Sequence, residues 1–138
     1  AAPRTKWVYK GAIVHTSKIE FTVELDENKI PENIIWTAED GGIDKELSKA
    51  IMLSVWDHKK KDTLRMDLWT KDMPVDEMKQ FFHQTLVSMA TSFERATDDQ
   101  KMTATMRDFC DYFAEKLELN KWWFLINICC SNKLYKIL

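Results

Sequence analysis

Polar and apolar residues alternate along the first half of the chain, in runs separated by short polar turns. Residues 18–25 alternate without interruption, and a turn at residues 26–29 leads into a returning run at residues 30–37. Strict alternation over four to eight residues is typical of half-buried β-strands. Pro31 cannot donate a ladder hydrogen bond, so we expect it at the start of the second strand or on an edge. The pattern predicts an antiparallel strand pair.

A second pair of alternating runs follows. Residues 38–46 contain a glycine pair and no alternation, and we interpret them as the longest loop. Residues 49–57 and 64–69 alternate again, with a charged turn at residues 58–62 between them. Successive side chains of a strand point to opposite faces. One face of this hairpin should carry Ile51, Leu53, Val55, Leu64, Met66 and Leu68, and the other Met52, Ser54, Trp56, Arg65, Asp67 and Trp69.

The second half of the chain changes to apolar spacings of three and four, which are typical of helices packed on a core. Asp72 is the expected N-cap of the first helix, with Pro74 in its first turn. Residues 97–99 should end that helix and cap the second. The apolar stripes are Val75, Met78, Phe82, Leu86, Met89 and Phe93 in the first helix, and Met102, Met106, Phe109, Phe113 and Leu117 in the second.

Four strands followed by two helices predict an α+β fold. We expect a two-layer sandwich in which two antiparallel helices cover one face of a four-stranded antiparallel sheet. The chain has 138 residues, of which 45% are hydrophobic and 30% charged, which suits one globular domain. We assign that domain to residues 16–119.

The two ends of the chain differ from its middle. Residues 1–15 carry basic residues without a secretory signal's apolar core, and residues 120–138 are rich in aromatic and apolar residues. The apolar run of the tail is too short to span a bilayer. An interfacial anchor, a packing arm and a non-native extension remain as interpretations of the tail, and the N-terminal extension is equally open to a non-native origin.

Candidate catalytic groups are few. The net charge of −2 gives no reason to expect nucleic acid, and the three cysteines have no metal-ligand spacing, which favours a reducing compartment. Asp57, His58 and Asp62 resemble a metal site or an acid–base pair, but three lysines in the same turn would repel a cation. We expect His83 to be a boundary or core histidine and Cys110 to be a buried, inert thiol. We therefore predict a protein that is not an enzyme and has no cofactor or metal.

One face of the predicted hairpin is the candidate functional surface. We assign Met52, Trp56, Arg65 and Trp69 to a partner-binding or oligomer face, because tryptophan, methionine and arginine are enriched at interface cores. An apolar patch of this kind often marks a binding surface. Two other interpretations stay open: a terminal arm covers this face, or the tryptophans are exposed singly.

Two segments carry a resemblance to a known family. TSKIEF at residues 16–21 and VELDEN at residues 23–28 are similar to the start of the gliding-motility protein GldC family. SVWDH at residues 54–58, followed by TLRMDLWTKDMPVDEM at residues 63–78, resembles the most recognisable segment of that family. The similarity runs over residues 16–119 and leaves both ends of the chain outside.

The resemblance implies a small cytoplasmic protein of gliding Bacteroidetes, linked to the surface-motility machinery and its associated secretion system. It carries over no catalytic residue. The implied partners are another copy of the chain, another motility or secretion protein, or both, without nucleic acid or a membrane span. The order of elements is also similar to that of the export chaperone SecB. This fold-level analogy makes a chaperone module that binds unfolded clients the alternative function.

Overall fold

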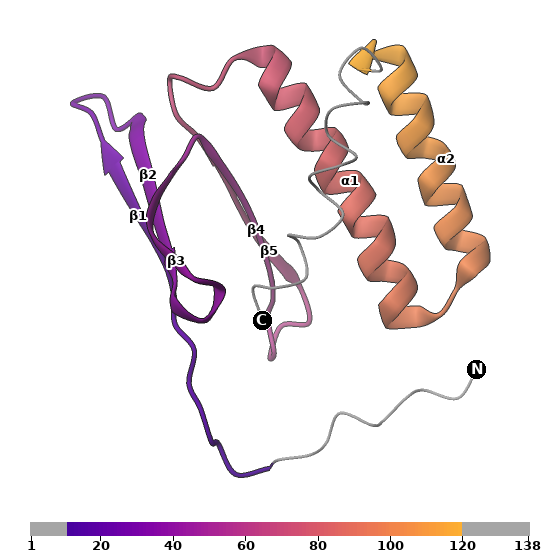
Figure 1. The fold of residues 1–138 in the computed structure, drawn as a ribbon, viewed down its shortest axis with the longest axis horizontal. Coiled ribbons are helices and arrows are strands. Elements are labelled where there is room, and N and C mark those ends of the chain that lie inside the picture. The colour runs from indigo at the N-terminus through magenta and orange to yellow at the C-terminus, as the bar shows by residue number, and fades with distance from the viewer. Residues whose placement is uncertain (1–10, 120–138) are drawn as a thin grey trace.

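A computed structural model of the chain describes residues 11–119. The strands are β1 (Ile19–Leu25), β2 (Pro31–Ala38), β3 (Ile43–Ser48), β4 (Ala50–Trp56) and β5 (Thr63–Trp69), with a short 3₁₀ turn η1 (Glu39–Gly41) before β3. The helices are α1 (Val75–Thr97) and α2 (Gln100–Lys116), which run antiparallel beside each other (Figure 1). The α+β class is therefore confirmed.

The strands form two antiparallel sheets, so the prediction of a single four-stranded sheet is wrong. β1, β2 and β3 make one sheet in that order, and β4 and β5 make the second. β3 lies where we expected a loop at residues 38–46. Its sequence has only two large apolar residues, and Lys45 has a positive φ of 50°, so the alternation that identifies a strand is missing. Its backbone nevertheless pairs with β2.

The two sheets meet at Lys49, the only residue between β3 and β4. One extended stretch of chain therefore passes from the first sheet into the second. On the side of the first sheet, Ile34 of β2 opposes Ser48. On the side of the second, the backbone N–H of Thr70 donates to the carbonyl oxygen of Lys49 at 2.8 Å. This junction holds the base of the β4–β5 hairpin against the three-stranded sheet.

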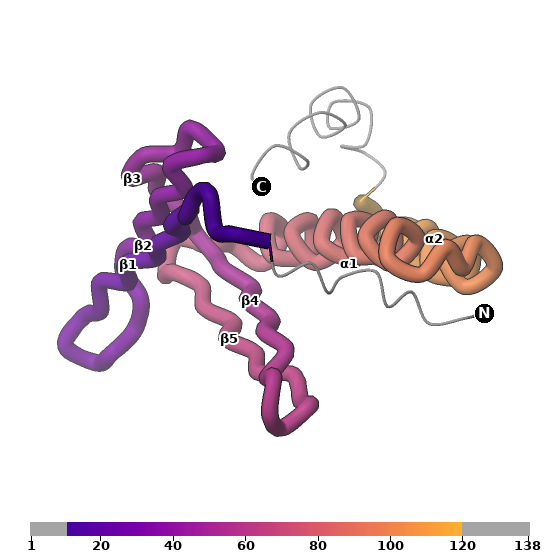
Figure 2. Tube along the Cα trace, turned by 90° about the horizontal axis from the view of Figure 1, so that it is seen from below, coloured from indigo at the N-terminus to yellow at the C-terminus, as the bar shows by residue number. Residues whose placement is uncertain are grey.

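The helices do not form a layer over a sheet face, which corrects the predicted sandwich. Figure 2 shows the helix pair extending to one side of the strands, while the β4–β5 hairpin projects in a different direction. Helix α1 approaches the strands near its beginning, where Lys49 Nζ binds the Glu77 carboxylate at 2.9 Å. The hairpin and the helix pair therefore diverge from a common base.

The starts of the two helices differ from each other. Pro74 is the residue before α1, its backbone is extended, and no side chain caps this end. Asp72 is therefore not the N-cap, because the helix begins later than predicted. A proline disfavours the helical conformation of the residue before it, which keeps Met73 outside the helix. At α2 the expected cap is present, since Asp99 Oδ1 accepts a hydrogen bond from the N–H of Met102 at 2.9 Å.

Replacing Asp99 with alanine should lower the free energy of unfolding by about 1 kcal/mol, the usual cost of losing an N-cap. Asp99→Ser keeps an oxygen in the capping position and should retain most of this stability. Urea unfolding followed by circular dichroism would measure both. An equal loss in the two variants would contradict the capping role.

The buried positions of α1 and α2 differ from the predicted stripes, although the stripe residue Phe113 does contact α1 by stacking on His83. The buried residues are His83 and Ala90 on α1, and Thr103, Cys110 and Ala114 on α2. Several large stripe residues are instead exposed, namely Val75, Phe82, Met89, Met102 and Phe109. The prediction that the whole stripe faces a core is therefore wrong for these five positions.

The core of the described residues is small. Ile34 at the centre of the three-stranded sheet has no exposed surface, and it is the only large side chain in residues 11–119 that is fully buried. Ala38 at the end of β2 and Ile51 near the start of β4 are nearly buried. On the same face of the first sheet, the rings of Phe21 and Trp36 stack with centroids 6.1 Å apart. Many other large apolar side chains in this range remain half exposed.

Candidate interaction surface

The register of the β4–β5 hairpin places the predicted interaction residues on one face. Directly opposed residues in an antiparallel pair lie on the same side of the sheet. Met52 opposes Asp67, and Ser54 opposes Arg65. We call this side the tryptophan face and define it by Met52, Ser54, Trp56, Arg65, Asp67 and Trp69. The shared placement is thus observed, whereas the binding role of these residues remains a prediction.

Both tryptophans of this face are open to solvent. Trp56 is 65% exposed near the tip of the hairpin, and Trp69 is 56% exposed at its base. Trp56 opposes Thr63, which lies six residues from Trp69, so the two indoles are separated by about 20 Å along the hairpin. Between them, Arg65 and Asp67 form an ion pair of 2.9 Å. The face therefore combines two aromatic anchors with a polar centre.

The opposite side of the hairpin, which we call the aliphatic face, is covered only at its base. It consists of Ile51, Leu53, Val55, Leu64, Met66 and Leu68. Ile51 is 7% exposed, whereas Leu64 is 52% exposed nearer the tip. An expectation from alternation that Leu64 and Met66, together with Leu68, belong to the core is wrong for Leu64 and Met66, because the hairpin projects away from the rest of the fold. A two-stranded hairpin that is open on both faces lacks the burial that normally stabilises strands.

The hairpin tip uses its carboxylates to hold the turn. Asp57 Oδ1 accepts hydrogen bonds from the backbone N–H groups of residues 59 and 60, at 2.9 and 2.6 Å. Asp62 Oδ1 accepts from the next backbone N–H at 2.8 Å. His58 lies exposed in the same turn. In the part of the chain that the structure describes, no three His, Cys, Asp or Glu side chains gather as metal ligands. The geometry fits a solvated turn.

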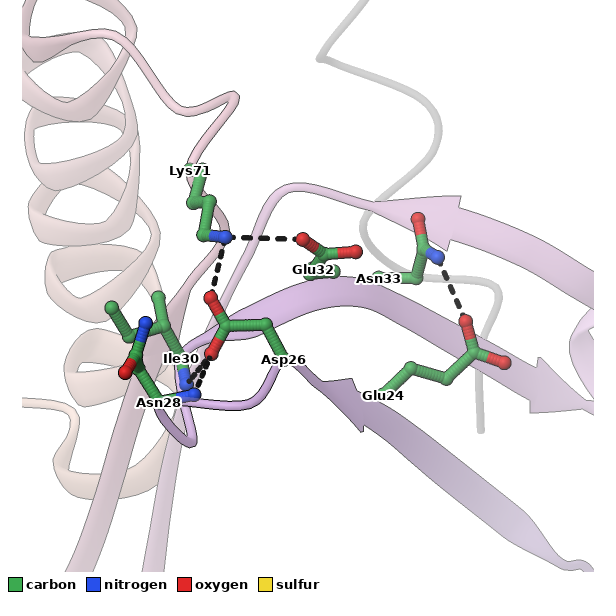
Figure 3. A network of polar contacts seen from close by, with 7 residues as sticks. All are labelled: Glu24, Asp26, Asn28, Ile30, Glu32, Asn33 and Lys71. Carbon is green, nitrogen blue, oxygen red and sulfur yellow. Dashed lines mark hydrogen bonds and ion pairs between the residues drawn. The ribbon is translucent and has the colours of Figure 1, made fainter.

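A network that the sequence analysis missed ties the end of β5 to the turn between β1 and β2 (Figure 3). Lys71 Nζ contacts Asp26 Oδ2 at 2.5 Å and Glu32 Oε1 at 3.0 Å. Asp26 Oδ1 also accepts hydrogen bonds from the N–H groups of Asn28 and Ile30 at 2.8 and 2.9 Å. An aspartate that begins a turn is a known signal for such bonds. Its pairing with a lysine 45 positions later has no local signal.

The network shifts the ionisation of both partners. The hydrogen bond from Lys71 and those from the turn backbone hold the pKa of the Asp26 carboxyl below its ordinary value of 3.8. The hydrogen bonds to Asp26 and Glu32 raise the pKa of Lys71 above its ordinary value. At neutral pH both charges are therefore present, and they fix the base of the hairpin relative to the first sheet.

The contribution of Asp26 to stability should disappear in acid. Because its pKa is lower in the folded chain, the stabilisation is present above the unfolded value near 3.8 and is lost as the pH falls through the folded value. The Tm of Asp26→Asn should therefore lie below that of the wild type at pH 7, and the gap should close below pH 4. Glu27→Gln in the same turn is the control. A gap that stays constant with pH would contradict this role.

His83 and Cys110 are both buried, as expected from their positions on the helices. His83 is 6% exposed and stacks on the ring of Phe113 with centroids 6.1 Å apart. Burial raises the pKa of the Cys110 thiol, with a smaller contribution from the charge of Asp111. A raised thiol pKa lowers the fraction of reactive thiolate.

A shallow depression lies between the strand junction and α1. Its lining includes Ser48 and Ala50 from the strands and Gln80, Phe81 and Gln84 from the helix. The ion pair between Lys49 and Glu77 crosses its edge. The depression thus combines polar and apolar side chains from the strands and from the helix.

A comparison with known protein families decides the broader identity. A family model described as "Gliding motility-associated protein GldC-like" matches residues 31–119. The chain belongs to the GldC-like family. The match spans β2 to α2, so it includes the whole β4–β5 hairpin. The resemblance found in the sequence is confirmed, although the segment at residues 16–30 lies before the matched range.

Two other comparisons add no relative. No curated protein and no solved structure matches the chain. Between residues 11 and 119, neither helix of this GldC-like protein combines the length and apolarity that crossing a bilayer would require. The predicted apolar tail lies outside the described residues.

Proposed function

We propose that this GldC-like protein is a non-enzymatic accessory protein of gliding motility and its associated secretion machinery, and that it acts in the cytoplasm by binding other proteins. The family match supports the link to gliding motility. The observation that carries the binding role is the tryptophan face, which projects on a hairpin with both indoles more than half exposed.

The chemistry of this face suits a protein partner. Tryptophan and arginine are the residue types most enriched among binding hot spots, and a tryptophan can bury 150–250 Å² in a complex. The ion pair between Arg65 and Asp67 supplies directional polar groups between the two aromatic anchors. The titratable groups near the hairpin tip hold the turn, so they do not compete with this role.

A pull-down from gliding cells that carry a tagged chain tests the proposal. The double variant Trp56→Ala and Trp69→Ala should lose a partner that the wild type captures, because truncation of a hot-spot tryptophan typically costs about 2 kcal/mol or more in binding. That cost corresponds to at least about a 30-fold weaker Kd for each residue. The same variant should fail to restore gliding in a deletion strain.

The matched control is a double variant at two residues that are as exposed but lie elsewhere. Leu47 on β3 is 72% exposed and Val75 at the start of α1 is 71% exposed. Leu47→Ala with Val75→Ala should keep both the partner and gliding. Circular dichroism confirms that each variant is folded. Retention of partner and motility by the tryptophan variant would overturn the proposal.

A chaperone-like activity is the second candidate, because open apolar side chains also occur on the helices. Phe82, Met89, Met102 and Phe109 are 45–51% exposed. Such a surface would bind unfolded clients without sequence preference. The test is suppression of the aggregation of a denatured protein at equimolar amounts. Suppression that survives loss of both tryptophans but not Phe82→Ser with Phe109→Ser would support this candidate. Absence of suppression in the wild type would exclude it.

A further inference from the structure

The outer edge of β5 is an unpaired strand edge. Within residues 11–119, β5 pairs with β4 on one side only. The hydrogen bonds from Asp57 N to Asp62 O and from Thr70 N to Lys49 O, both 2.8 Å, show which residues of the hairpin exchange backbone bonds. Because these groups alternate in direction along a strand, the even-numbered residues of β5 bond to β4. The N–H and C=O groups that point outward are those of Thr63, Arg65, Asp67 and Trp69.

The sequence of this edge is complementary to itself in the antiparallel direction. β5 reads TLRMDLW, with Met66 at its centre. When a second copy runs in the opposite direction with Met66 opposite Met66, Arg65 lies opposite Asp67 of the second copy. Leucines lie opposite leucines on the aliphatic face. Like charges never oppose one another in this arrangement, and the two copies together form two cross-strand ion pairs.

Backbone geometry selects the same register. Pairing centred at Met66 places residues whose backbone N–H and C=O groups point away from β4 opposite residues of the same kind, so these groups can bond. A shift by one residue would place these residues opposite residues whose backbone groups point toward β4, and the hydrogen bonds would be lost. The next registers that keep the bonds are centred at Arg65 or Asp67. They place like charges directly opposite each other, which is destabilising.

We propose that the chain forms a two-fold symmetric dimer in which the β5 edges of two copies pair, centred at Met66, and join the two hairpins into one four-stranded sheet. Closed two-fold dimers are the commonest homo-oligomers, and their interfaces are self-complementary. The dimer places both tryptophan faces on one side of the sheet. This inference goes beyond the proposed motility function and does not rest on it.

The dimer accounts for two features of the isolated chain. Exposed strand edges are often protected by lysine or proline, and β5 contains neither residue, although it carries Arg65 and Asp67. A sheet of four strands is also more stable than a two-stranded hairpin. Among residues 11–119 the outer edge of β4 is unpaired as well, but its sequence, AIMLSVW, has no charged residue to fix a register. Pairing through β4 is therefore the alternative that the experiments must distinguish.

Charge reversal tests the pairing. R65D sets acidic residues opposite one another across the two-fold axis, and D67R sets basic residues opposite one another. Each variant alone should be monomeric by analytical ultracentrifugation, whereas the wild type is dimeric. An equimolar mixture should form a heterodimer, because the acidic pair of one chain then opposes the basic pair of the other. Neither variant retains the ion pair between positions 65 and 67 of its own strand. Dimerisation of the mixture would therefore come from pairing between the two chains and not from a more stable monomer.

Two outcomes of the ultracentrifugation measurements would overturn the proposed dimer. One is a wild type that remains monomeric at high micromolar concentration. The other is a mixture in which folded R65D and D67R chains stay separate. If either variant does not fold by circular dichroism, cross-linking decides instead.

A cysteine at the two-fold axis provides that second test. At a non-hydrogen-bonded pair the two Cα atoms are about 4.5 Å apart, which is within the range for a disulfide. With Cys110, Cys129 and Cys130 replaced by alanine, M66C should form a covalent dimer in air. L64C, on the same strand and face, should not, because its two copies would lie about 14 Å apart. Cross-linking of L53C at the centre of β4, without M66C, would overturn the proposal.

Discussion

Replacing Ile34 with alanine should lower the free energy of unfolding by about 2–5 kcal/mol, the range observed when a fully buried isoleucine is truncated. Ile34 has no exposed surface and lies on the central strand of the first sheet, where it opposes Val23 on one side and Ser48 on the other. Truncation removes apolar contacts and leaves a cavity beside the sheet junction. Urea unfolding followed by circular dichroism measures the loss.

Two control variants calibrate this result. Ile34→Val removes one methylene group and should cost about 0.5–1.5 kcal/mol. Leu47→Ala on the neighbouring strand should change stability by less than about 0.5 kcal/mol, since its side chain is 72% exposed. If Ile34→Ala costs no more than Leu47→Ala, the first sheet does not depend on this side chain. The core would then have to be completed elsewhere, most simply by a second copy.

Alternation predicted the β4–β5 hairpin well, because a period of two assigns every residue to a face once the strand is identified. Both faces were predicted with their correct members. The exposure of Leu64 and Met66 was not predicted, because alternation shows which residues share a face but not whether other residues cover that face. β3 was missed for a related reason. Its few apolar residues leave no periodic signal, and only pairing with β2 reveals the strand.

The helices show the same division between local and tertiary information. Spacings of three and four predicted that two helices exist, and the cap at Asp99 predicted where the second begins. The pattern of large residues did not predict which face of each helix meets the other, because that contact depends on close approach. Ala90 and Ala114 occupy it, and small residues carry little weight in a hydrophobic pattern.

The candidate site divides in the same way. Alternation in the sequence identifies the residues of the tryptophan face. The self-complementary order of residues in β5 can also be read from the sequence. The sequence does not show which edge of the hairpin is unpaired or which backbone groups point outward. The junction between Asp26 and Lys71 depends on chain segments 45 positions apart, so it was visible only in the folded chain.

Replacing Ala90 with leucine should lower the free energy of unfolding by about 1–3 kcal/mol, the typical cost of overpacking a buried site. Ala90 has no exposed surface in the middle of α1. Farther along the same contact, Arg107 of α2 binds Glu94 of α1 at 2.7 Å, which limits how far the helices can separate. The added side chain must therefore displace neighbouring atoms or break this ion pair. Thermal and urea unfolding would both report the loss.

Ala96→Leu is the matched control, because it adds the same side chain to an exposed position of the same helix. It should change stability by less than about 0.5 kcal/mol. A similar small effect of Ala90→Leu would mean that α1 and α2 separate easily in solution. The helix pair would then gain its stability from the large residues of the predicted stripes, in contact with something other than the strands of the same chain. The difference between the two leucine variants thus measures whether the small-residue contact holds the helices together.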